Sequence, residues 1–164
     1  MLTEDELLEL DLLTLRDHTE RAGDTIDPEV HRRTITRSLA ISQLCAVRRN
    51  GVLAAYAMVR PEMDDSWFVT AFNTHPMHRT PDVLRELLLS FAQIVKRFGI
   101  RELKSNVYKT NQLSMAFHKH LGFRVTKENE RGVEFTATLS ELELSPAIRR
   151  TRHRMHRQHA STDA

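Results

Sequence analysis

Asn111 and His118 stand seven residues apart in the stretch NVYKTNQLSMAFHKHLGF, residues 106–123. Asparagine begins helices by accepting backbone N–H groups, and a glycine such as Gly122 ends them. A helix N-terminus favours an anionic ligand, and a histidine is a competent general acid near neutral pH. The stretch therefore predicts a helix that begins at Asn111, ends at Gly122 and carries His118 as a candidate general acid. The alternative is an exposed helical histidine.

The upstream stretch THPMHRTPDVLRELLLSFAQ, residues 74–93, offers a possible phosphate site at the start of a second helix. His78, Arg79 and Arg85 are the candidate phosphate ligands. Asp82 opposes them, because a carboxylate about 4 Å from a phosphate oxygen costs on the order of 4 kcal/mol at an effective dielectric constant of 20. An aspartate near a helix start also caps free N–H groups. Both a structural cap and a phosphate site therefore remain open.

Hydrophobic periodicity and turn residues predict the helices and strands that position these candidate residues. Helices are predicted over residues 3–21, 28–41, 81–98 and 111–121. Strands are predicted over residues 43–49, 52–60, 66–73 and 100–108, with two more on either side of a polar turn at 129–132. Asn50-Gly51 predicts a tight hairpin between the first two strands. This order predicts one α/β domain, residues 1–144, with a mixed sheet.

Composition favours a cytoplasmic protein. Cys45 is the single cysteine, and no apolar run approaches the roughly 18 residues of a membrane span. The formal net charge of +2 conceals an acidic N-terminal segment, residues 1–20, and a basic Arg/His-rich tail, residues 145–164. The tail is expected to lie against the acidic segment or to bind an acidic partner or nucleic acid. His153, His156 and His159 have no cysteine or acid to complete a metal site, so no metal is predicted.

The chain resembles the GNAT superfamily of N-acetyltransferases over roughly residues 3–140. In that family a helix-starting asparagine is followed seven residues later by a tyrosine, and then by Gly-Phe. Asn111, Gly122 and Phe123 keep this spacing, and His118 takes the tyrosine position. The resemblance implies a mostly antiparallel central sheet flanked by helices and splayed between the family's fourth and fifth strands. It also implies acetyl-coenzyme A as acyl donor and His118 as the acid that protonates the departing thiolate.

The family's pyrophosphate loop, V-x-P-x-x-R-G-x-G-x-G/A, has lost its glycines in this chain. Aligned on Pro76 and Arg79, the glycine positions hold Thr80, Asp82 and Leu84. Glycines let backbone N–H groups approach a pyrophosphate. The loss implies weakened use of acetyl-coenzyme A, or another acyl thioester such as one carried by acyl carrier protein.

The resemblance also places the remaining site residues. Backbone donors for the oxyanion are expected around Asn73 to His75, and His75, held extended by Pro76, is expected to direct its ring into the cleft as a candidate base. Three turn acids, Glu62, Asp64 and Asp65, are expected to be solvated. The cofactor contacts expected are Asn73, Thr74, His75, His78, Arg79, Arg85 and Asn111.

The sequence is consistent with two functions. The first is a GNAT-type acyltransferase that moves an acyl group, acetyl by default, to an amine-bearing small molecule or protein. The second is a catalytically inactive GNAT-like module that binds a protein or nucleic acid through its cleft or basic tail. For both functions the oligomeric state is left open, with a homodimer as one candidate.

Overall fold

The computed structural model describes residues 2–150 of the 164-residue chain. Its helices are α1 (Glu4–Arg21), α2 (Pro28–Ile41), α3 (Pro81–Phe98), α4 (Gln112–Leu121) and α5 (Leu139–Leu144), with a short 3₁₀ turn, η1 (Pro76–His78). Its strands are β1 (Gln43–Arg49), β2 (Val52–Pro61), β3 (Trp67–Thr74), β4 (Glu102–Tyr108), β5 (Arg124–Glu128) and β6 (Gly132–Thr138). The predicted order is confirmed, and the structure adds η1 and α5, which are too short to show a period.

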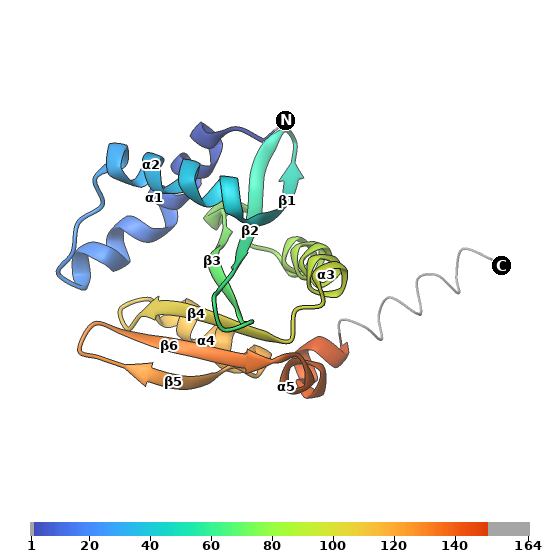
Figure 1. Cartoon of the computed structure of the whole chain (residues 1–164). Coiled ribbons are helices and arrows are strands. Elements are labelled where there is room, and N and C mark those ends of the chain that lie inside the picture. The colour runs from blue at the N-terminus through green and yellow to red at the C-terminus, as the bar shows by residue number, and fades with distance from the viewer. Residues whose placement is uncertain (1, 151–164) are drawn as a thin grey trace.

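The six strands form one sheet in the order β1-β2-β3-β4-β6-β5 (Figure 1). All neighbouring pairs are antiparallel except β3 and β4. That parallel pair has only two registered positions, Trp67 with Leu103 and Phe68 with Lys104, and beyond them the strands separate. The predicted mixed, mostly antiparallel and splayed sheet is thereby confirmed.

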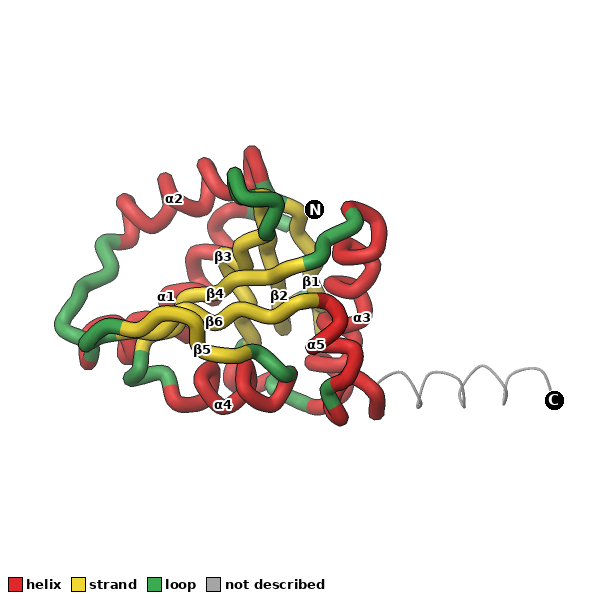
Figure 2. The backbone as a smooth tube through the Cα atoms, turned by 60° about the horizontal axis from the view of Figure 1, so that its bottom comes forward, coloured by secondary structure: helices red, strands yellow, loops and turns green. Residues whose placement is uncertain are grey.

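Helices cover both faces of the sheet, with α1 and α2 on one side of β2 and β3 and α3 on the other (Figure 1, Figure 2). The alternation of side chains along β2 explains this arrangement. Tyr56 and Met58 belong to the core under α1 and α2, whereas Ala55 and Ala57 belong to the core under α3. Because β2 is buried on both faces, it reads as a nearly continuous apolar run.

Local signals account for the element boundaries. Thr3 and Glu6 form the expected capping box at the start of α1, and the Asp27 side chain caps α2 ahead of Pro28. The turn between β1 and β2 has φ of 51° at Asn50 and 83° at Gly51. Positive φ at both centres is what the type I′ hairpin requires.

The C-terminal end of the described chain packs against α4. Ser145 is buried, and its hydroxyl donates to the carbonyl oxygen of His120 at 3.1 Å. Residues 146–150 are helical. Most of the predicted basic tail, including His153, His156 and His159, lies outside the described residues. Within residues 2–150 no helix has the length and apolarity to cross a membrane.

Candidate active site

A cavity of about 310 Å³ lies where β3 and β4 separate. Its walls come from both strands, from α1 on one face of the sheet, and from α3 and α4 on the other. The cavity therefore passes through the sheet. Of the predicted site residues, the structure brings together Asn73, Thr74, Arg79, Asn111 and His118 as lining residues. His75, His78 and Arg85 are not part of this lining.

The edge of β3 that faces the cavity carries backbone groups released from strand pairing. His75 N donates to Ala54 O at 2.8 Å, so the backbone of His75 faces β2. Residues in an antiparallel pair alternate between facing the partner strand and facing away from it. Thr74 and Phe72 therefore direct their N–H and C=O groups away from β2, toward the gap. The available donors are these two residues rather than Asn73 or His75.

His118 is buried in the cavity wall, with only 7% of its surface exposed, so it is not the exposed helical histidine of the alternative interpretation. Its ring stacks on Phe135 with centroids 4.8 Å apart, and its Nδ1 lies 2.8 Å from the Ser114 carbonyl oxygen. Because that oxygen can only accept, Nδ1 carries the proton of the neutral ring. Nε2 has no hydrogen-bond partner among residues 2–150. Burial lowers the pKa of His118.

Helix α4 is fixed at both ends, which sets the position of His118. The Asn111 side chain accepts a hydrogen bond from Ser114 N at 3.1 Å, so this residue caps the helix as predicted. Gly122 ends it with φ of 101°, and Phe123 N donates back to His118 O at 3.0 Å. Because Oδ1, the backbone N–H and the backbone C=O of Asn111 are engaged, a contact of this residue with a ligand must use Nδ2.

Arg79 braces the rim of the cavity. Its Nε donates to Thr74 Oγ1 at 2.8 Å and its Nη2 donates to Thr74 O at 3.1 Å.

His75 does not direct its ring into the cleft, because its Nδ1 accepts from Met77 N at 3.2 Å and so caps η1. The expectation for His75 is therefore wrong in geometry. Its ring instead lies against that of His78, with centroids 5.1 Å apart.

The residue that caps the start of α3 is not the one expected from the sequence. Thr80 is the N-cap, with its side chain accepting from Val83 N at 3.3 Å. Asp82 lies in the first helical turn, and its carboxylate pairs with Arg85 at 2.9 Å. The interpretation of Asp82 as the cap is wrong, because the extended backbone of Thr80 places a hydroxyl over the free N–H groups first.

The turn acids between β2 and β3 lie at the opposite end of β3 from Thr74. Glu62 pairs with Arg60 at 2.6 Å, and Asp64 pairs with Lys104 and accepts from Ser66. The hydrogen bond from Lys104 is the main reason that the pKa of Asp64 is lowered. None of these turn acids, Asp65 included, lines the cavity.

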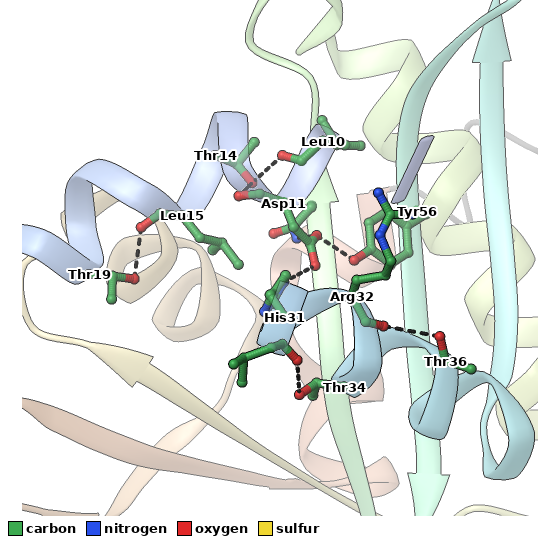
Figure 3. Close-up of polar contacts among 12 residues, drawn as sticks. Leu10, Asp11, Thr14, Leu15, Thr19, His31, Arg32, Thr34, Thr36 and Tyr56 are labelled. Carbon is green, nitrogen blue, oxygen red and sulfur yellow. Dashed lines mark hydrogen bonds and ion pairs between the residues drawn. The ribbon is translucent and has the colours of Figure 1, made fainter. Parts of the chain in front are cut away.

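Sequence reasoning missed the wall that α1 supplies. Thr14, His18 and Thr19 of this helix line the cavity. Next to them, Asp11 is buried and accepts hydrogen bonds beneath α1 (Figure 3). The signal was present as polar residues interrupting the leucine stripe of residues 7–15, but periodicity identifies a helix and not the surface it meets.

Comparison with protein families decides the identity of this fold. The model of the acetyltransferase (GNAT) domain matches residues 24–136. The chain belongs to the GNAT acetyltransferase family. No curated protein matches this GNAT chain by sequence.

Solved structures agree with this GNAT fold at low sequence identity. The PaiA N-acetyltransferase of Thermoplasma acidophilum, in complex with coenzyme A, is 17% identical with a TM-score of 0.66, covering 82% of this chain and 92% of that one. A GNAT-family acetyltransferase of Staphylococcus aureus Mu50 is 13% identical with a TM-score of 0.68, covering 83% and 92%. The ribosomal-protein-alanine N-acetyltransferase of Brucella melitensis is 19% identical with a TM-score of 0.58, covering 84% and 97%.

Proposed function

We propose that this GNAT protein transfers an acetyl group from acetyl-coenzyme A to an amine in the cavity between β3 and β4. The observation that carries the proposal is the unpaired edge of β3 on one side of the cavity and His118 on the other. Acyl transfer from a thioester to an amine needs a base or a water relay that takes the ammonium proton, donors for the developing oxyanion and an acid for the leaving thiolate. The edge of β3 and His118 match the last two requirements, and the ammonium proton passes to water in the cavity.

The residues present suit the pantetheine arm of the cofactor. The arm is narrow and carries two amides, which can pair with a strand edge. Phe72 offers its N–H and C=O groups for that purpose and Thr74 its N–H, since Thr74 O already accepts from Arg79. A cavity of about 310 Å³ also lies near the lower limit of ordinary ligand pockets, roughly 300 Å³. The crystallised coenzyme A complex of the Thermoplasma protein supports the same cofactor.

The loop from His75 to Arg85 suits the phosphates less well. Its threonine, aspartate and leucine add side chains where the family pattern has glycines, and Arg79 and Arg85 are already paired with Thr74 and Asp82. Binding of the cofactor is therefore expected to depend more on the arm than on the pyrophosphate.

Catalysis would then rest on two groups of this chain, with acetyl-coenzyme A supplying an activated acetyl thioester. The Thr74 N–H, directed into the gap, stabilises negative charge on the thioester oxygen. His118 protonates the leaving sulfur from Nε2, because Nδ1 is held by Ser114. Only the imidazolium has a proton on both nitrogens. Burial lowers the pKa of His118, so the imidazolium forms at a lower pH than it does on a solvent-exposed histidine.

The test combines binding and turnover. Isothermal titration with coenzyme A and with pantetheine should give binding of both, with a smaller difference between them than a glycine-rich loop would produce. Acetyl transfer should then be measured to a set of amines: glycinamide, spermidine, kanamycin and a peptide beginning with alanine. The last is included because of the Brucella relative's named substrate class. Absence of binding by coenzyme A and by acyl carrier protein, together with absence of transfer, would contradict the proposal and favour the inactive binding module.

A further inference from the structure

A buried carboxylate lies directly behind the cavity wall on the α1 side. Asp11 of α1 is 4% exposed, and its charge partner is His31 of α2. Its Oδ1 accepts from the Tyr56 hydroxyl and from Asn73 Nδ2, the latter at 2.6 Å. Its Oδ2 lies 2.8 Å from Nε2 of His31 on α2 (Figure 3). The carboxylate thus joins α1, α2, β2 and β3 at one point.

This carboxylate fixes which way the Asn73 amide faces. An ionised carboxylate accepts hydrogen bonds and cannot donate them, so the amide must present its NH₂ group to Asp11. Tyr56 keeps its proton for the same interaction, because burial and the neighbouring Asp11 raise its pKa well above the usual value. The amide oxygen of Asn73 is consequently directed away from Asp11.

That oxygen remains available to a ligand. Asn73 lines the cavity, and its Oδ1 has no hydrogen-bond partner among residues 2–150. Within the same residues, Ser42 Oγ is the one side-chain atom that is both fully buried and unpaired. Oδ1 of Asn73 therefore keeps access to the cavity space. Asn73 immediately precedes Thr74, and the N–H of Thr74 is directed into the gap.

We propose that Asn73 Oδ1 binds an N–H of the acceptor amine and that Asp11 is the positioning residue that orients and polarises it. Side chains of β3 alternate between the faces, and Asn73 points to the α1 face, whereas Phe72 packs on Phe91 of α3. An amine entering on the α1 side would meet this oxygen beside the thioester. The negative charge of Asp11, transmitted through the amide, favours binding of a cationic amine over a neutral alcohol. The bound ammonium passes one proton to water in the cavity, and the neutral amine then attacks the thioester carbon.

This inference rests on the proposed function, and its test uses variants of the full chain with every amine that the wild type acetylates. Asn73→Leu keeps the branched shape and removes Oδ1 together with the Nδ2 donor to Asp11. We expect the KM for the amine to rise about 10- to 100-fold, as for a lost hydrogen bond to a charged group. The KM for acetyl-coenzyme A should stay within about twofold of wild type, because the arm uses backbone groups of β3.

Asp11→Asn separates charge from orientation. An amide at this position can still accept from Asn73 and Tyr56 with its oxygen. Its NH₂ group can donate to His31 Nε2 once the His31 proton moves from Nε2 to Nδ1, because Nε2 donates to the carboxylate in the wild type. The hydrogen bond to Asn73 is kept and the negative charge is lost, so we expect a smaller rise in the amine KM, about three- to tenfold, for every accepted amine.

Leu10→Val is the matched control, since it removes a buried methylene from the neighbouring residue of α1 and leaves Asn73 untouched. It should lower the melting temperature and leave the amine KM at the wild-type value. An unchanged amine KM in Asn73→Leu, or an equal rise in Leu10→Val, would overturn the inference while leaving acetyl transfer intact. A wild type that acetylates no amine would contradict the proposed function itself, and the inference with it.

Discussion

Helix α4 and the loop from His75 to Arg85 both correspond to family motifs, but they have diverged in different ways. In α4 the helix ends are retained and His118 is buried against Phe135, where it contacts the cavity. In the loop, Arg79 is paired with Thr74 at the end of β3 and Arg85 with Asp82. The α4 motif therefore still presents a side chain to the cavity, whereas the cations of the loop are paired with nearby side chains.

The largest expected effect comes from breaking the α4 side. His118→Ala removes the proposed acid, and kcat should fall about 10²- to 10⁴-fold with little change in KM, as for an interaction made mainly in the transition state. Steady-state kinetics with the best amine of the set measures this. His120→Ala is the control, because His120 is an exposed histidine on the same helix. Equal turnover by His118→Ala and wild type would remove His118 from the mechanism.

The pH dependence of kcat sharpens the same side of the comparison. Burial lowers the pKa of His118 below its usual value of 6.5, so the acid form is lost as the pH rises through a value below 6.5. We expect kcat to decline over that range and to stay low above it, if protonation of the leaving group limits the rate. His118→Tyr should flatten the profile, because tyrosine with a pKa near 10 remains protonated. A wild-type plateau from pH 5 to 9 would count against imidazolium catalysis.

The sequence predicted the elements that are set by local chemistry. The Asn111 cap, the Gly122 end and the Asn50-Gly51 turn depend on residues a few positions apart, and each is confirmed. The splay between β3 and β4 came from family resemblance, because no residue pattern in either strand states where their pairing ends.

The errors arose where two residues of similar chemistry competed or where the partner is distant in sequence. Thr80 and Asp82 can both cap a helix, and only the chain path decides that Thr80 does so. Pro76 holds His75 extended but does not fix the direction of its ring, which turns to Met77 N. Asp11 meets Asn73 across 62 positions, a contact that one sequence does not reveal.

The loop side of the comparison can be tested first through stability. Thr80→Ala removes the N-cap of α3 and should lower the free energy of unfolding by about 1 kcal/mol, within a range of roughly 0.5–2. Asp82→Ala removes a mostly exposed ion pair and a favourable dipole interaction, and should cost about 0.5 kcal/mol. Urea denaturation of both variants measures the difference. A larger loss for Asp82→Ala would restore Asp82 as the principal stabiliser of the helix start.

The smallest expected effect is a gain of phosphate binding in Asp82→Asn. An acid about 4 Å from a phosphate would cost on the order of 4 kcal/mol at an effective dielectric constant of 20. The Asp82 side chain is 75% exposed and paired with Arg85, so solvent and that cation screen it. The expected gain is therefore about two- to fivefold in affinity for coenzyme A, in the range of an exposed ion pair. Pantetheine, which lacks the phosphates, should bind both proteins equally. Glu86→Gln is the matched charge control, since Glu86 lies on the same helix as Asp82 and pairs with Arg49 of β1. A gain above a hundredfold would show that Asp82 alone suppresses phosphate binding, and that the loop remains a phosphate site once this charge is removed.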